Sequence, residues 1–151
     1  MTEIRFYHLR RDTADRAVPE LVSKALEHGH KILLKLPDTA RRQHYDDWLW
    51  RYRTDSFLPH GQDGDPQAEG QPVWLSTSDD APNNASMALV VEGAELPPLE
   101  KFKLLCLMFS SENEVELERS RSLWRSLKGQ KTLSLTYWQQ QENGSWAKAN
   151  V

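Results

Sequence analysis

The sequence predicts an α/β protein: a three-layer, Rossmann-like domain with a mainly parallel central sheet and helices on both faces. The first third of the chain alternates short apolar runs with amphipathic segments in the order strand, helix, strand, helix, which favours a parallel sheet. A later run, residues 102–109, is almost entirely apolar, as expected of a central strand covered on both faces. A chain of 151 residues has room for one such domain, so we expect residues 1–151 to fold as a single unit.

The elements of the first half follow from apolar spacing and from turn residues. Residues 4–9 form a strand, and Pro19 suits the first turn of a helix that ends near His28. Residues 31–36 form the next strand. A second helix covers residues 39–50, with Asp38 or Thr39 as its cap. Residues 61–71 contain three Gly and one Pro, which predicts a surface loop.

In the second half, the remaining strands are predicted at residues 73–75, 87–91, 102–109 and 133–138. The sequence Ser111-Glu112-Asn113-Glu114 has the order of a capping box and opens a helix over about residues 112–128. Acidic residues load the start of this helix and basic residues its end, in agreement with the helix dipole. Asn143-Gly144 predicts a tight turn that brings Trp146 back alongside the last strand.

Composition restricts the classes of function. The net charge of -3 argues against a dedicated binder of duplex DNA, whose surface is normally strongly basic. The single cysteine, Cys106, lies in an apolar run, so we expect a packed thiol, no disulfide within the chain and a cytoplasmic location. The longest apolar run, residues 104–109, is far too short to cross a bilayer.

The residues that usually carry chemistry do not form a recognisable site. The five histidines have no metal-ligand spacing, and no acids cluster with a nucleophile and a base. Arg10-Arg11-Asp12-Thr13 stands where a dinucleotide-binding protein has its glycine-rich loop. We therefore expect no catalytic site, no metal, no cofactor and no nucleotide-binding loop.

The helix predicted over residues 112–128 carries the most informative surface. Its core-facing arc comprises Leu117, Ser120, Leu123, Trp124 and Leu127. Arg121, Arg125 and Lys128 occupy the next arc, which begins just beyond Trp124. One interpretation is a half-buried Trp beside helix-end cations that complement the dipole. The other is a site for a short acidic peptide that carries an apolar side chain.

A second group of aromatic residues lies where the 39–50 helix ends. Trp48, Leu49 and Trp50 cannot all point inward from one helix, so at least one side chain lies near the surface. Phe57 and Pro59 follow within a few residues and could simply anchor the loop. Core anchoring suits Phe57, whereas partner contact is plausible for Trp50 or His60.

The sequence resembles the chi subunit family of bacterial DNA polymerase III over nearly its whole length. The matching segments are Phe6-Tyr7-His8-Leu9, Leu49-Trp50 with Ser56-Phe57-Leu58-Pro59-His60, and Arg121-Ser122-Leu123-Trp124-Arg125. The resemblance implies a non-catalytic accessory subunit of the polymerase complex. It also implies DNA replication as the process, with nucleic acid contacted only indirectly.

The resemblance further implies two partners. One is the acidic, Phe-ending tail of single-stranded DNA-binding protein, bound at Arg121, Trp124 and Arg125 together with Lys128. The other is the psi subunit or another clamp-loader component, for which Trp50, Phe57, Pro59 and His60 are candidates, in a monomer or heterodimer. The family pattern often has a basic residue where this chain has Leu117, so the resemblance implies a tail site that lacks this cation. The alternatives are a stand-alone nucleic-acid-binding protein and a nucleotide-dependent α/β protein.

Overall fold

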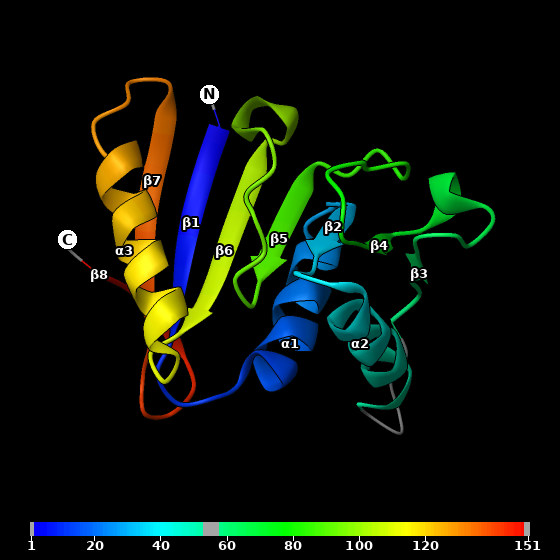
Figure 1. Ribbon diagram of the computed structural model, residues 1–151, viewed down its shortest axis with the longest axis horizontal. Helices are drawn as coiled ribbons and strands as arrows, with labels where there is room; N and C mark the ends of the chain where they lie inside the picture. The colour runs from blue at the N-terminus through cyan, green and yellow to red at the C-terminus, as the bar shows by residue number, and fades with distance from the viewer. Residues whose placement is uncertain (1, 53–57, 150–151) are drawn as a thin grey trace.

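The computed structural model describes residues 2–52 and 58–149, and these residues build one eight-stranded sheet (Figure 1). The strands are β1 (Thr2–Leu9), β2 (Ile32–Lys35), β3 (Gly61–Gln62), β4 (Val73–Ser76), β5 (Met87–Val91), β6 (Leu104–Ser110), β7 (Leu133–Gln140) and β8 (Trp146–Ala149). The α-helices of the described residues are α1 (Ala14–Glu27), α2 (Thr39–Arg51) and α3 (Glu114–Leu127). Short 3₁₀ turns lie at Ala68–Gly70 and Leu99–Lys101.

The strand order is β3-β4-β2-β5-β6-β1-β7-β8, and every neighbouring pair is parallel except β7 with β8. The predicted α/β class and the mainly parallel sheet are therefore confirmed. In this order β1 lies between β6 and β7, whereas a usual doubly wound dinucleotide-binding sheet has the order 3-2-1-4-5-6. The finer assignment to a three-layer, Rossmann-like arrangement stays a prediction.

Two hydrophobic clusters form the core, and strand β6 contributes to both. Because successive side chains of a strand point to opposite faces, Leu104, Cys106 and Met108 belong to the cluster that includes α1 and α2. Leu105, Leu107 and Phe109 belong to the cluster that includes α3. The sequence prediction of a strand that is apolar on both sides is confirmed. Burial raises the pKa of the Cys106 thiol to about 12, as expected of a packed, unreactive cysteine.

Helix α1 begins five residues earlier than the position of Pro19 suggested. Pro19 lies inside the helix, where its ring nitrogen cannot donate to the carbonyl of Asp15 four residues before it. The Nε1–H of Trp48 in α2 donates to that Asp15 carbonyl instead, at 2.5 Å. The prediction of Pro19 in the first turn was wrong because a side chain from a distant helix satisfies the carbonyl that the proline leaves free.

The starts of the other two helices show how local side chains set their boundaries. Asp38 caps α2 as predicted, and its carboxylate accepts a hydrogen bond from the backbone N–H of Arg41 at 2.8 Å. Helix α3 begins later than predicted, because Asn113 rather than Ser111 is the cap. The Asn113 side chain accepts from the N–H groups of Val115 and Glu116, both at 3.1 Å.

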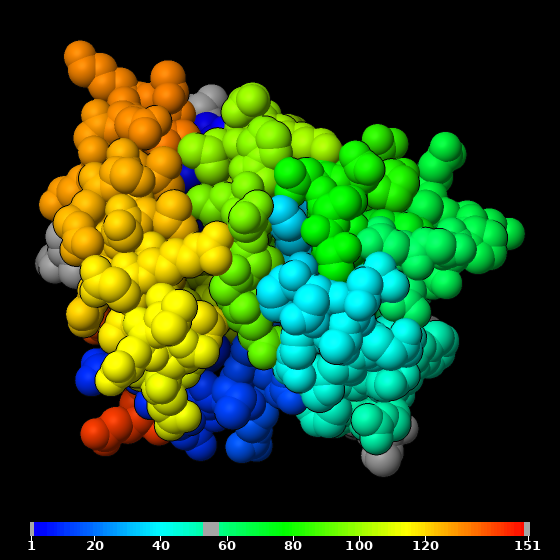
Figure 2. All heavy atoms as spheres, viewed as in Figure 1, coloured from blue at the N-terminus to red at the C-terminus, as the bar shows by residue number. Residues whose placement is uncertain are grey.

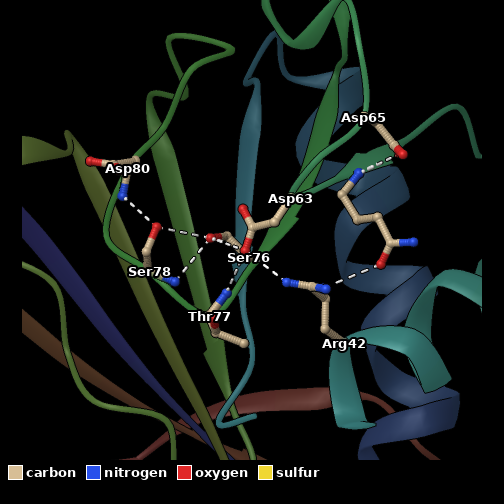
Figure 3. A network of polar contacts seen from close by, with 8 residues as sticks. Arg42, Asp63, Asp65, Ser76, Thr77, Ser78 and Asp80 are labelled. Atoms are coloured by element: carbon tan, nitrogen blue, oxygen red, sulfur yellow. Dashed lines mark hydrogen bonds and ion pairs between the residues drawn. The ribbon is translucent and has the colours of Figure 1, made fainter. Parts of the chain in front are cut away.

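The predicted loop at residues 61–71 is partly regular structure. Gly61 and Gln62 form β3, which pairs with β4 at the edge of the sheet. A Cβ atom on Gly61 would lie 2.9 Å from Cζ3 of Trp74, so only glycine lets β3 approach β4 here. Polar side chains then fix this edge: Arg42 of α2 donates to Asp63 at 3.0 Å, and Asp63 accepts from Ser76 at 2.9 Å (Figure 3).

The predicted final hairpin is confirmed. Gly144 has φ +88°, in the left-handed region, and the chain returns as β8 antiparallel to β7. The Trp146 ring packs edge-to-face on Tyr7 of β1, with the ring centroids 5.0 Å apart. None of the helices in residues 2–52 and 58–149 combines the length and apolar character that a membrane crossing needs.

Candidate functional site

Helix α3 packs on the sheet through Trp124. This half-buried ring stands edge-on to Phe6 of β1 at 5.2 Å and to Tyr137 of β7 at 5.5 Å between centroids. Figure 2 shows α3, in yellow and orange, at the surface beside the yellow-green segment that follows β5. The predicted place of Trp124, at the border of the apolar face, is confirmed.

The three cations predicted beside Trp124 are exposed. Arg125 lies 3.4 Å from the Glu118 carboxylate, and both side chains are about two-thirds exposed, so this ion pair contributes little. Arg121 and Lys128 form no ion pair with any residue that the structure describes. Lys128 is the cap residue that follows α3. We call Arg121, Arg125 and Lys128 the basic ridge, because these three exposed cations follow one another along the end of α3.

An open groove of about 700 Å³ lies between α3 and the β7–β8 hairpin, and Lys128 of the basic ridge and Lys148 of β8 contribute cations to its lining. Trp124 and Lys128 line it on the helix side. On the sheet side it is lined by Leu133, Leu135, Tyr137 and Ala149, among others. The side chains of Leu133, Leu135 and Tyr137 alternate along β7 and share the face that α3 covers in part. The groove therefore combines an apolar floor with a cationic border.

The floor of this groove was missed at the sequence level. The signal was present, because residues 133, 135 and 137 are large and apolar at strand spacing. Without the strand order, it could not be known that β7 is covered on one side by α3 and followed at the sheet edge by β8. Leu117, one turn before Arg121, packs against the core cluster on the α3 side of the sheet. The basic ridge therefore begins at Arg121.

The backbone after β1 is already engaged where a phosphate loop would lie. The N–H groups of Arg11 and Asp12 donate to the side-chain oxygen of Gln140, at 3.0 Å and 2.9 Å. Gln140 is buried and its amide donates in turn to the Asp12 carboxylate at 2.8 Å. Amide groups that would cradle a phosphate thus serve to hold the loop to β7, which disfavours the nucleotide-dependent alternative.

The crevice at the carboxyl ends of β5, β6 and β1 is acidic. Ligands of open α/β sheets usually bind at such an edge. Here the lining includes Glu92, Glu112, Glu114 and Glu116. Burial, together with the charge of Glu92, raises the pKa of Glu116. Within the described residues, no group of three or more His, Cys, Asp or Glu side chains is arranged to hold a metal ion.

The second predicted surface lies on α2, which belongs to the opposite core cluster from α3. The Trp50 side chain is 55% exposed and its ring lies 5.2 Å from that of His60. His60 is buried: Nε2 meets the Asp46 carboxylate at 3.0 Å and Nδ1 meets the Leu58 carbonyl at 2.7 Å. Pro59 is exposed, and Phe57 lies outside the described residues. The structure thus brings Trp50 and His60 together, and their binding role stays a prediction.

These features define a class of protein: an α/β domain with a mainly parallel sheet, a loop after β1 whose N–H groups bind Gln140 instead of a phosphate, and a groove beside the basic end of α3. A family model described as "DNA polymerase III chi subunit, HolC" matches residues 1–133. The chain belongs to the DNA polymerase III chi subunit family, so the resemblance is confirmed.

A curated relative agrees with this assignment. The "Probable DNA polymerase III subunit chi" of Rickettsia prowazekii (strain Madrid E) is 25% identical over 103 residues. The aligned part covers 68% of this chain and 62% of the relative, so the chain spans less than two thirds of that protein. The family match ends at residue 133, so nearly all of β7 and the whole of β8 lie beyond it.

Proposed function

We propose that this protein is a non-catalytic subunit that links the clamp-loader part of DNA polymerase III to single-stranded DNA-binding protein. In this proposal the acidic, Phe-ending tail of that protein binds in the groove beside α3. The observation that carries the proposal is the apolar groove next to the basic ridge, whose Arg121 and Lys128 have no ion-pair partner in the described residues. The family assignment supports the same function.

The chemistry of the tail suits this groove. The carboxylates of an acidic peptide would pair with Arg121, Arg125 and Lys128, while its apolar side chain would lie on Trp124 and Tyr137. The guanidinium and ammonium groups are exposed, so the Coulomb attraction is screened by salt and the affinity is modest. Nucleic acid would then be contacted only through the bound protein, in keeping with the net charge of -3.

Removing two cations of the ridge should weaken tail binding. We expect Arg121→Ala combined with Arg125→Ala to lower the affinity for a short acidic, Phe-ending peptide by up to about thirtyfold, since each exposed charge contact is worth up to about 1 kcal/mol. Calorimetric titration at about 50 mM and about 300 mM salt measures this, and the wild-type affinity should fall with salt.

A matched control is Arg16→Ala combined with Arg119→Ala, which changes the net charge equally. Arg16 lies on α1, and Arg119 lies on α3 away from the groove, where it donates to the Gly93 carbonyl at 2.6 Å. This control should bind like the wild type. Equal loss in both double variants would mean that only the total charge matters, and unchanged binding without Arg121 and Arg125 would exclude the ridge as the tail site.

We also propose that the surface around Trp50 attaches the protein to psi or to another clamp-loader component. An exposed indole on a helix end is the kind of group that dominates a protein interface. The buried His60, which is hydrogen-bonded to Asp46 and to the Leu58 carbonyl, packs against the Trp50 indole and limits its movement. Pro59 completes the candidate surface, and Phe57 stays a candidate on sequence grounds alone. The complex would be a heterodimer, the free protein a monomer, and the location the cytoplasm.

Truncating the exposed indole should separate attachment from tail binding. We expect Trp50→Ala to keep the fold and the tail affinity but to weaken association with the clamp loader by about 2 kcal/mol or more. Co-purification with clamp-loader components measures association, and thermal melting checks the fold. Val115→Ala is the control, because Val115 is also a large exposed apolar residue but lies on α3. Association that survives Trp50→Ala would place the attachment surface elsewhere.

A further inference from the structure

Beside the basic ridge, two more polar side chains, those of His8 and Arg10, lie at the carboxyl end of β1. Helix α3 connects two parallel strands, β6 and β7, and therefore runs opposite to them. One turn before Trp124, the helix presents Arg121 toward the carboxyl end of β1. On β1, His8 follows Phe6 on the same face, and Arg10 is the next residue of that face, just past the strand. Arg121, His8 and Arg10 therefore converge.

His8 is a buried imidazole with an unused nitrogen. The residue is only 8% exposed, and its ring stacks on Phe109 of β6 at 4.9 Å between centroids. Nδ1 lies 3.0 Å from the hydroxyl oxygen of Tyr137 on β7. Nε2 has no hydrogen-bond partner among the described residues. A buried polar atom without a partner is unusual and indicates a group that changes state or meets a ligand.

The guanidinium groups of Arg10 and Arg121 change the pKa values of both His8 and Tyr137. Burial lowers the pKa of His8, and the charges of Arg10 and Arg121 lower it further. Burial raises the pKa of Tyr137, and the same two charges oppose that rise. Neither Arg10 nor Arg121 forms an ion pair with a described residue, and both side chains are exposed. Among the described residues, the charges that act on His8 are thus those of Arg10 and Arg121, and the nearest carboxylate to share a pocket with Arg10 is that of Glu142, in the turn after β7.

We infer that Arg10, Arg121 and the Tyr137 hydroxyl form a receptor for one peptide carboxylate, and that His8 acts behind Tyr137 as a proton-linked positioning residue. This inference rests on the proposed tail binding and adds Arg10, Tyr137 and His8 to it. Two adjacent guanidinium groups and one hydroxyl are donors suited to the oxygens of a carboxylate. Tyr137 also lines the groove, so the receptor is continuous with the peptide site.

The hydrogen bond between His8 and Tyr137 provides the proton linkage. In a neutral imidazole only one nitrogen carries a hydrogen. If that nitrogen is Nε2, Nδ1 accepts a hydrogen bond from the Tyr137 hydroxyl; if it is Nδ1, this nitrogen donates to the Tyr137 oxygen and Nε2 is an acceptor without a donor. In the protonated ring Nδ1 must donate to the Tyr137 oxygen, and the hydroxyl hydrogen is free to donate to a bound carboxylate. The carboxylate also offsets the charges of Arg10 and Arg121. Binding and protonation of His8 therefore favour each other.

The test is the pH dependence of peptide binding. We expect the wild type to bind a short acidic, Phe-ending peptide about threefold more tightly at pH 5.5 than at pH 7.5. Because burial and the charges of Arg10 and Arg121 lower the pKa of free His8, this change requires a rise of about half a unit or more in that pKa on binding. NMR titration of the His8 imidazole, with and without peptide, should report that rise directly. His8→Gln should remove the pH dependence, Tyr137→Phe should reduce it, and Arg10→Gln should weaken binding at both pH values.

Arg16→Gln is the control for Arg10→Gln, because it removes the same charge from α1. A peptide with an amidated C-terminus distinguishes the terminal carboxylate from a side-chain carboxylate: loss of the pH dependence identifies the terminal group, and its retention identifies a side chain. An unchanged pKa of His8, or wild-type behaviour of Tyr137→Phe and Arg10→Gln, overturns this inference while tail binding stands. No peptide binding by the wild type at either pH overturns the proposed function as well.

Discussion

Trp124→Ala is expected to lower the free energy of unfolding by about 3 kcal/mol, which is the lower end of the range for removing a large aromatic side chain. The value is low in that range because the ring is only half-buried. The loss includes the edge-to-face contacts with Phe6 and Tyr137, at 5.2 Å and 5.5 Å between centroids. Denaturant unfolding measures the effect. The same variant should also lose peptide binding, since Trp124 lines the groove.

Trp124→Phe separates the two consequences of this substitution. A phenyl ring keeps most of the contact with Phe6 and Tyr137, so the loss of stability should be about 1 kcal/mol. If Trp124→Ala unfolds at the same denaturant concentration as the wild type, the helix is held to the sheet mainly by other residues. Leu123 and Leu127, which also pack against the core cluster on this face, would then be the principal anchors.

Asp79→Ala is expected to cost about 3 kcal/mol of stability, because it leaves a buried ammonium without its carboxylate. Lys35 ends β2 and its side chain is only 7% exposed, whereas its partner Asp79 is 43% exposed. For a protein of this size, such a loss lowers the melting temperature by roughly 6–12 °C. Thermal melting of the purified variant measures it.

Lys35→Met removes the buried charge itself rather than its partner. Removing the charge itself and filling the space with an apolar chain should change the stability by less than about 1 kcal/mol. The double variant with Lys35→Met and Asp79→Ala should melt near Lys35→Met alone, because no buried charge is then left unpaired. If Asp79→Ala melts like the wild type, water reaches the ammonium and the ion pair contributes only as a surface pair does.

Much of the fold could be predicted because local signals agree with the tertiary structure. The run at residues 102–109 became β6 and the Asn143-Gly144 turn became the β7–β8 hairpin. The errors share a different cause. Pro19 was placed at a helix start because a proline inside a helix leaves a carbonyl, here that of Asp15, without its hydrogen bond. The donor that satisfies this carbonyl, Trp48, lies 33 residues away along the chain, so local sequence could not reveal it. The strand β3 was missed because a two-residue edge strand has no periodicity to detect.

The candidate site could be predicted only in part, for a similar reason. Helical spacing alone places Trp124 beside Arg121 and Lys128. The floor of the groove comes from β7, and the contact of Tyr137 with His8 joins two strands 129 positions apart. Spacing within one segment cannot report such a contact. The exposure of Trp50 was anticipated because three consecutive large side chains cannot all face one core, yet the burial of His60 was not.

In addition to their shared hydrophobic cluster, α1 and α2 are joined by polar contacts that converge on Asp15. Its carbonyl accepts from Trp48, and its carboxylate meets His44 at 2.9 Å and Arg41 at 3.5 Å. Opening α1 alone would therefore expose the carbonyl left free by Pro19 and break contacts with two turns of α2 at once. The two helices consequently form one cooperative unit in local unfolding, and the amides of both should become accessible to solvent exchange together rather than one helix at a time.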